Sequence, residues 1–331
     1  MLHTPICDAL GIAYPVCQAG MANYTSPELV AAVSRAGGLG FHGTLGREPE
    51  ELRALLRATR ALLTDEPFGV NLVLGRLDEG AFAVCLAERV PIYCFAWGDP
   101  GPWVGRARAT GAKVMAQVTT VAEVAAARAA GVDAIVAQGT EGGGHSGFVP
   151  LAELLPAVTA AAGTTPVLAA GGIVDGAGLA AALALGAAGG WLGTRFLATP
   201  EATISPAWKA AILAAGAGDT VHTAAFDQLW GQPWPGAQVR ALRNRFTDEW
   251  AGRESRLLAQ RETIQAAVWQ AERDDDPSLF ALMAGTGVGA IETLLPAGEI
   301  VRLIIEQAET TIARLAEYTA PQPFEREGRG R

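Results

Sequence analysis

Aromatic side chains, cysteines and long basic runs are all scarce in this sequence, and each shortage excludes a class of protein. Aromatics make up only 7% of the 331 residues although 50% are hydrophobic, so small side chains supply the apolar character. The formal net charge of −9, without any long Lys/Arg run, argues against a surface for nucleic acid or anionic membranes. The length suffices for one large domain, or for one domain with a satellite, and a disordered chain and a disulfide-stapled mini-protein are both excluded.

The four cysteines lie in the first third of the chain and form no Cys-x-x-Cys pair. This spacing predicts neither a zinc site nor a disulfide framework, and no other metal site is expected. Free thiols of this kind fit a reducing, cytoplasmic setting best. Cys17 and Cys94 have no cation nearby in the sequence, so we interpret them as core residues.

The mean hydropathy of +0.22 raises the question of a membrane-spanning segment. Two uncharged stretches, 154–174 and 176–194, are long enough to cross a bilayer. They are rich in Ala, Gly and Thr and are interrupted by Pro156, Pro166 and glycine pairs, which predicts alternating buried helices and strands instead. The chain does not open with a basic segment followed by an apolar one, so export is not expected.

Short apolar runs alternate with helical patterns along the first two thirds of the chain. Runs such as 132–137 are apolar almost throughout, which is typical of parallel strands covered on both faces. Eight such units predict an α/β fold, the (β/α)₈ TIM barrel. A doubly wound open sheet is the alternative, but its glycine-rich turn usually follows the first strand, whereas here such turns come late. The expected strands are 14–18, 38–42, 68–74, 92–97, 113–118, 134–138, 167–170 and 190–192.

The composition changes after residue 206, where tryptophans and arginines become frequent and a polar helical stretch runs over 246–273. We therefore assign 216–283 to a smaller helical second domain on the substrate side. The barrel takes 1–215 and 284–320, and 321–331 is expected to be a frayed tail. An amphipathic segment at 297–315 is expected to return and pack on the barrel.

Glycine-rich turns follow the last two expected strands, at Gly171-Gly172 and at Gly193-Thr194. In a barrel these two loops commonly hold a phosphate group, and glycine lets backbone N–H groups approach it closely. We interpret the turns as a phosphate site, with purely structural tight turns as the alternative.

A longer glycine run, 138–147, follows the sixth expected strand and carries His145. Such a run costs conformational entropy on folding, so it suggests a close approach of backbone to a ligand. An imidazole at the mouth of a barrel can act as a general acid or base near neutral pH. A loop histidine held by a backbone group is the alternative, and His3, His42 and His222 are interpreted as structural.

Polar side chains end or follow three other expected strands, namely Gln18, Asn71 and Gln117, with Gly20 and Met21 close behind the first. An amide offers both a donor and an acceptor, which suits the edge of a heteroaromatic ring. Each of these residues alone could be structural. Together they predict a planar cofactor whose phosphate tail reaches the two late glycine turns.

Five segments resemble FMN-dependent nitronate monooxygenases, formerly called 2-nitropropane dioxygenases. They are 14–22, 67–72, 132–147, 170–176 and 192–201, and a looser similarity continues at 240–247 and 283–289. The resemblance implies a TIM barrel with a helical second domain, in agreement with the fold expected from the strand pattern.

The same resemblance implies the cofactor and the reaction. His145 matches the family's active-site histidine, which contacts the substrate and in some members takes the α-proton of a neutral nitroalkane. The implied reaction passes an electron from an alkyl nitronate to the flavin, with O₂ as acceptor, and gives a carbonyl compound and nitrite. The residues implied to bind FMN are Gly20, Met21, Ala22, Asn71, Gln117, Gln138, Gly144, Gly171, Gly172, Gly193 and Thr194.

Two departures from the family pattern touch the implied substrate pocket. Thr286 stands where many members have Gln, and the Trp-rich region 216–236 is unfamiliar. An NAD(P)H-dependent FMN reductase of enoyl thioesters or quinones stays open as an alternative, as does a non-catalytic FMN-binding protein. The expected partners are a small-molecule substrate and O₂, without nucleic acid or membrane, and a homodimer is a further candidate.

Overall fold

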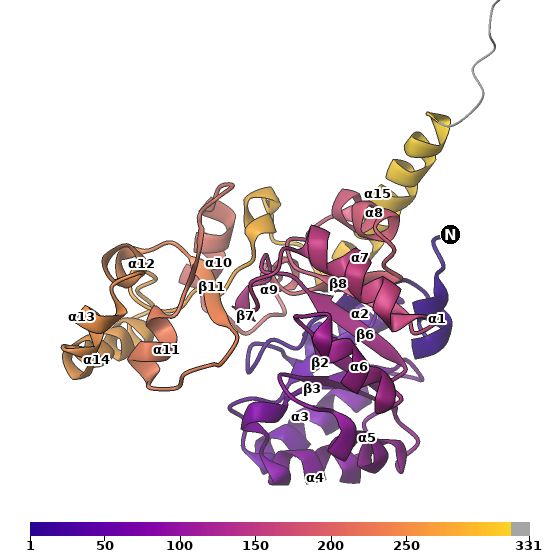
Figure 1. The fold of residues 1–331 in the computed structure, drawn as a ribbon, viewed down its shortest axis with the longest axis horizontal. Coiled ribbons are helices and arrows are strands. Elements are labelled where there is room, and N and C mark those ends of the chain that lie inside the picture. The colour runs from indigo at the N-terminus through magenta and orange to yellow at the C-terminus, as the bar shows by residue number, and fades with distance from the viewer. Residues whose placement is uncertain (319–331) are drawn as a thin grey trace, which may run out of the picture.

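The computed structural model describes residues 1–318 and contains a barrel of eight parallel strands (Figure 1). The sheet order is β1-β9-β8-β6-β5-β4-β3-β2, and a parallel bridge between Cys17 and Leu39 links the two end strands, so the barrel is nearly closed. The predicted TIM barrel is confirmed, and the open sheet is wrong. The predicted tail, 321–331, lies outside the described residues. The strands are β1 (Val16–Gln18), β2 (Gly40–Gly43), β3 (Phe68–Val73), β4 (Ile92–Ala96), β5 (Lys113–Val118), β6 (Ala134–Gln138), β8 (Val167–Ala170) and β9 (Gly189–Leu192).

Helices surround the barrel, as the strand and helix alternation predicts (Figure 1). The two uncharged stretches, 154–174 and 176–194, are indeed divided among helices and strands, and no helix within residues 1–318 has the length and apolar composition of a membrane span. The last helix, α15, packs against α8 and α2, which confirms that this amphipathic segment returns to the barrel. The helices are α1 (Pro5–Leu10), α2 (Pro27–Arg35), α3 (Pro49–Leu62), η1 (Leu74–Arg76), α4 (Glu79–Ala87), α5 (Gly101–Arg108), α6 (Ala122–Ala129), α7 (Leu151–Ala162), α8 (Gly176–Ala184), α9 (Thr194–Leu197) and α15 (Ala297–Glu317).

Side chains that point inward from the strands fill the barrel as a packed core. Phe41 and Trp191 pack with their ring centroids 4.5 Å apart, and Met115 lies in the same cluster. Cys17 and Cys94 are fully buried there, so the prediction of core thiols is confirmed. Burial raises the pKa of Cys94 to about 12, which keeps the thiol protonated and unreactive at neutral pH.

A second hydrophobic core lies beside the barrel and is built around Phe226, Phe246, Trp250 and Phe280. The segment predicted as helical also contributes two strands, which join a strand from the barrel's glycine run in the antiparallel order β10-β11-β7. This small sheet ties the second core to the barrel (Figure 1). The remaining elements, which form the small sheet and the helices around it, are β7 (Gly144–Ser146), α10 (Pro206–Ala214), β10 (Thr220–Thr223), α11 (Ala225–Trp230), β11 (Gln238–Leu242), α12 (Arg245–Trp250), α13 (Glu254–Leu258), α14 (Arg261–Arg273) and η2 (Thr286–Ala290).

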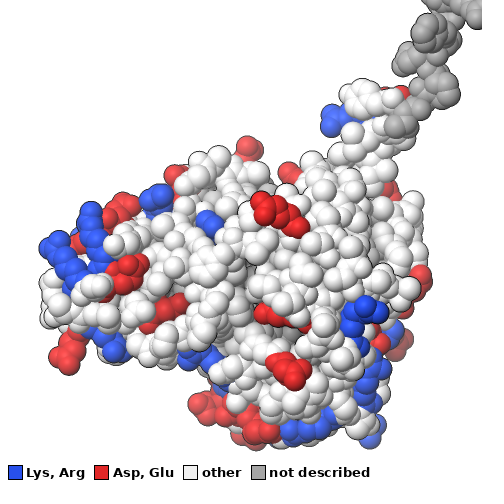
Figure 2. All heavy atoms as spheres, in the orientation of Figure 1, with Lys and Arg blue, Asp and Glu red and all other residues white. Residues whose placement is uncertain are grey.

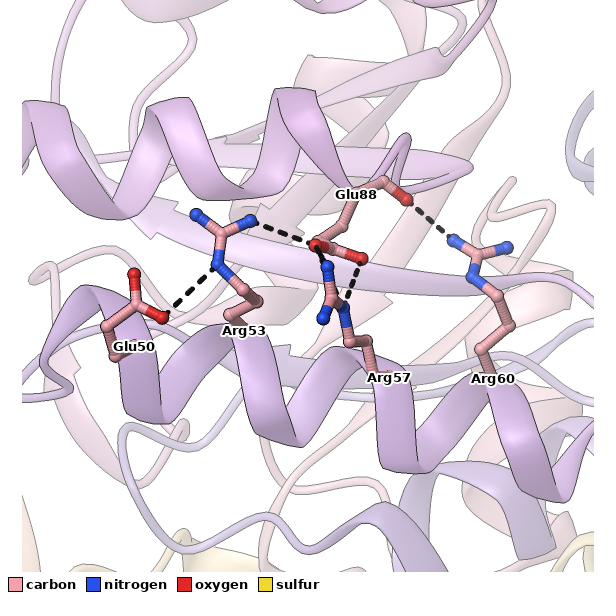
Figure 3. Close-up of polar contacts among 5 residues, drawn as sticks. All are labelled: Glu50, Arg53, Arg57, Arg60 and Glu88. Atoms are coloured by element: carbon pink, nitrogen blue, oxygen red, sulfur yellow. Dashed lines mark hydrogen bonds and ion pairs between the residues drawn. The ribbon is translucent and has the colours of Figure 1, made fainter.

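Ion pairs connect two of the outer helices on the barrel side. Glu88, just after α4, accepts hydrogen bonds from Arg53 and Arg57 on α3, and its carbonyl oxygen accepts one from Arg60 (Figure 3). Glu50 pairs with Arg53 at 3.4 Å in the same cluster. In Figure 2, charged groups of both signs gather over the α12 to α14 lobe and the α3 to α5 side, and the surface between these regions carries few of them.

Candidate functional site

A single cavity at the carboxyl ends of the barrel strands contains His145 and every residue that the resemblance implies for FMN binding, but not Gln18. This edge of a TIM barrel is where catalytic and binding loops lie. The structure thus brings the predicted residues together, while their binding roles stay predictions. The predicted residues that line the cavity are Gly20, Met21, Ala22, Asn71, Gln117, Gln138, Gly144, His145, Gly171, Gly172, Gly193 and Thr194.

The glycines after β8 and β9 differ in why they are glycine. Gly171 and Gly172 have φ angles of 116° and 72°, which residues with a side chain rarely adopt, so the turn alone requires glycine there. Gly193 has an ordinary φ of −104°. A Cβ at Gly193 would meet nothing nearer than Met21 Sδ at 3.8 Å, so protein packing leaves this space open. The turn explanation therefore accounts for the first pair, and Gly193 favours an approach to a ligand.

Thr194 and the glycine run 138–147 contact a late segment of the chain, 284–286. The Thr194 hydroxyl accepts a hydrogen bond from Gly285 N at 2.9 Å, which leaves its own hydrogen free to donate. A Cβ at Gly143 would lie 2.7 Å from the carbonyl carbon of Ala284, so these backbones touch directly. Gly285 lines the cavity, whereas Thr286 does not, and the Thr286 N–H donates to the Glu141 carbonyl oxygen.

The amides divide into those that line the cavity and one that is fully buried away from it. Gln117 Nε2 donates to Gln138 Oε1 at 2.8 Å, and Gln138 Nε2 donates to the carbonyl oxygen of His145 at 3.2 Å. Gln138 therefore supports the histidine loop as well as lining the cavity. Gln18, in contrast, is fully buried and bonds to the backbone of Phe41 and of Ala19, so its candidacy as a cofactor contact is wrong.

The structure confirms the interpretation of His42 as a structural histidine. His42 is buried, with Nδ1 3.3 Å from Thr25 Oγ1 and Nε2 2.7 Å from Thr59 Oγ1. Burial lowers the pKa of His42 to about 3, so its imidazole stays neutral. It lies behind the cavity wall and is not among the lining residues.

His145 lies at the rim of the cavity, where two side chains from the segment 216–283 contact its ring. Its Nε2 is 2.8 Å from Asp227 Oδ1, and the two side chains are 14% and 4% exposed. Trp234 stacks on a face of the imidazole, with the ring centroids 3.8 Å apart and the ring planes inclined by 21°. A loop histidine held only by backbone is therefore wrong for His145.

The small antiparallel sheet explains how Asp227 reaches the histidine. His145 on β7 pairs with Val239 on β11, and β11 in turn pairs with β10, which leads directly into α11. Asp227 stands in the first turn of α11. Sequence reasoning missed this partner, because 82 residues separate the two side chains and no motif links them.

Trp234 is held over the site by residues from two barrel loops. Arg76 lies 4.9 Å from the Trp234 ring centroid and donates to the carbonyl oxygens of Gln232 and Pro233. Trp97 packs edge-on against Trp234 at 5.7 Å. Trp97 has a left-handed φ of 61°, a strained conformation that is concentrated at functional sites in proteins. The Trp-rich region that the sequence flagged thus supplies the outer wall of the cavity.

The comparisons with known proteins agree with this fold. A family model described as nitronate monooxygenase matches residues 3–83 and 76–307. The chain is 33% identical over 368 residues to a nitronate monooxygenase of Paraburkholderia phytofirmans, with 93% of this chain and 96% of that protein covered. It is 41% identical over 231 residues to (3aS,4S,5R,7aS)-5-hydroxy-7a-methyl-1-oxo-octahydro-1H-indene-4-carboxyl-CoA dehydrogenase of Mycobacterium tuberculosis. That match covers 69% of this chain and 65% of the relative, just under two thirds of its length.

Two solved structures are similar over almost the whole chain. FabK from Thermotoga maritima superimposes with a TM-score of 0.86 at 34% identity, covering 96% of this chain and 100% of that one. A nitroalkane oxidase from Streptomyces ansochromogenes gives a TM-score of 0.82 at 29% identity, covering 94% and 100%.

Proposed function

The chain belongs to the nitronate monooxygenase family, and we propose that it is an FMN-dependent oxidoreductase that oxidises alkyl nitronates and nitroalkanes with O₂. The products are a carbonyl compound and nitrite. The observation that carries this proposal is His145, which faces a glycine-lined cavity while a buried carboxylate and a tryptophan hold its ring. A positioned imidazole beside a glycine-lined cleft suits proton removal next to a redox centre.

The cavity fits FMN because backbone forms much of its lining, and at Gly144 and Gly193 an added Cβ would meet nothing nearer than 3.5 and 3.8 Å. Gly193 and Thr194, with Gly171 and Gly172, would hold the phosphate through backbone N–H groups and the threonine hydroxyl. Asn71, Gln117 and Gln138 would face the edge of the ring, and the backbone of Gly20, Met21 and Ala22, with Gly144, would lie beside it. The redox chemistry, electron transfer from the nitronate to O₂, is what a bound flavin supplies.

The chain's own residues bind and orient the substrate and move one proton. His145 takes the α-proton of a neutral nitroalkane, and Trp97 and Trp234 limit the access of water to that step. We assign substrate choice to 216–283, since this segment supplies Trp234, while 1–215 and 284–320 hold the cofactor. We further propose a cytoplasmic enzyme, as its free cysteines favour.

The test is to purify the protein, record its flavin absorbance, and supply propyl 2-nitronate under air while nitrite and acetone are measured. A yellow protein that releases nitrite and acetone in equal amounts is expected. A colourless protein that cannot be reconstituted with FMN would overturn the cofactor and the reaction together.

A second candidate is an FMN-dependent oxidoreductase of acyl thioesters, favoured by the 41% identity to the Mycobacterium tuberculosis CoA-ester dehydrogenase. Anaerobic mixing separates the two candidates. Bleaching of the flavin by NADH, with no spectral change on adding propyl 2-nitronate, would favour the second; the opposite pattern would favour nitronate oxidation.

A further inference from the structure

We propose that Asp227 is a positioning residue that fixes the proton of His145 on Nε2 and thereby leaves Nδ1 as the atom that accepts the substrate's proton. This role rests on the proposed function and adds to it a reason why the enzyme can act on neutral nitroalkanes, and not only on nitronates that have already lost the α-proton.

The hydrogen-bond chemistry of the pair determines the tautomer. An ionised carboxylate can only accept, so the 2.8 Å contact between Asp227 Oδ1 and His145 Nε2 requires the hydrogen to be on Nε2. The neutral ring then has its lone pair on Nδ1, and His145 lines the cavity. Because Asp227 is 4% exposed, water does not compete effectively for its carboxylate.

The same contacts favour the charged ring that forms when the proton moves. A neutral nitroalkane and a neutral imidazole become a nitronate anion and an imidazolium cation, so charge is conserved and no oxidant is needed in this step. The buried carboxylate of Asp227 offsets the new positive charge. The Trp234 face, 3.8 Å away, adds a cation–π attraction.

Arg240, His222 and Arg76 are the other charged or titratable groups near this contact, and His222 feels a repulsion from His145 that helps to lower the pKa of His222, after burial and Arg240. In the register of the small sheet, Arg240 pairs with Gly144 and with His222, and side chains alternate between faces along a strand. Arg240 and His222 therefore point to the face opposite His145, and Arg76 is separated from the imidazole by the Trp234 ring. Within residues 1–318, Asp227 is the acidic side chain in ion-pair contact with His145.

The experiment compares nitroethane with ethyl nitronate for the FMN-loaded wild type and for Asp227→Asn. An Asn can donate to Nε2 and so favours the wrong tautomer. We expect kcat/KM for nitroethane to fall about 10²- to 10³-fold, and that for ethyl nitronate by less than about tenfold, because the nitronate needs no base. Asp227→Glu restores part of the nitroethane activity. Asp248→Asn, an exposed acidic residue of the same lobe, serves as the matched control.

The outcomes separate this proposal from the proposed function. Equal losses with both substrates, or no loss in Asp227→Asn despite normal FMN absorbance, would overturn the positioning role. A wild type that oxidises ethyl nitronate but not nitroethane would overturn it too, while leaving nitronate oxidation intact. A wild type that acts on neither substrate would overturn both.

Discussion

The floor and the rim of the cavity are built in different ways, and the difference shows how the molecule divides its tasks. The floor consists of Gly171, Gly172, Gly193 and their neighbours after β8 and β9, where backbone rather than side chain meets the space. The rim consists of side chains, with His145 between Asp227 and Trp234. A backbone surface suits one invariant cofactor, whereas side chains can be exchanged to suit a substrate.

The largest expected effect is that of removing the imidazole from the rim. His145→Ala should lower kcat/KM for nitroethane by about 10³-fold, within the range for loss of a general base, and should keep its FMN absorbance. Nitrite release and the flavin spectrum measure the two quantities. His3→Ala, whose ring is exposed and pairs with Asp8, is the control. An unchanged rate in His145→Ala would instead support a non-catalytic FMN-binding protein.

The floor and the barrel could be predicted from sequence because each part is local. Strands, turns and glycine motifs such as 138–147 are continuous in the chain, and the barrel rule places their ends on one face. Each of the eight expected strands coincides with an observed strand to within two residues. The same rule gives a wrong prediction for Gln18, because a sequence does not show that its amide bonds to the Phe41 backbone.

The rim could not be predicted because it depends on pairing between distant segments. The strands β7, β10 and β11 are three to five residues long, and β7 lies inside a glycine run that shows no strand pattern. Only their antiparallel register brings α11, and with it Asp227, to the histidine. The tryptophans gave a partial signal, since their concentration after residue 206 pointed to the substrate side.

A smaller effect is expected from the stacked wall of the rim. Trp234→Leu removes the ring that packs on His145 and Trp97, and stacked aromatic pairs contribute about 0.5–1.5 kcal/mol. We expect kcat/KM for nitroethane to fall by up to about tenfold, mainly through a higher KM. Trp269→Leu, at a half-exposed tryptophan on α14, is the matched control. Equal effects of the two substitutions would contradict a role of Trp234 at the site.

The smallest expected effect comes from a change remote from both floor and rim. Glu88→Gln weakens the cluster that joins α4 to α3 (Figure 3), which should cost about 1 kcal/mol of unfolding free energy at pH 7 and leave nitronate turnover unaltered. Urea unfolding measures the cost. Glu50→Gln is the control, because its carboxylate is 83% exposed and makes a single ion pair in the cluster.

This stability difference should depend on pH in a defined direction. Hydrogen bonds and ion pairs from Arg57, together with those from Arg53, hold the pKa of Glu88 below its usual value. A lowered pKa means that the native state prefers the carboxylate, so the stabilisation is complete above the unfolded-state pKa, about 4.3, and is lost as pH falls through the native value. The gap between wild type and Glu88→Gln should therefore close in acid, and a gap that widens there would contradict the assignment.

The division between floor and rim is tested most directly by the FMN dissociation constant, measured by flavin fluorescence on protein stripped of its flavin. A Val side chain at Gly193 enters space that the structure leaves open, and overfilling costs about 1–3 kcal/mol. The account predicts that Gly193→Val weakens FMN binding about tenfold or more, while Trp234→Leu stays within about threefold of the wild type. Normal FMN affinity in Gly193→Val, with strongly weakened affinity in Trp234→Leu, would contradict it.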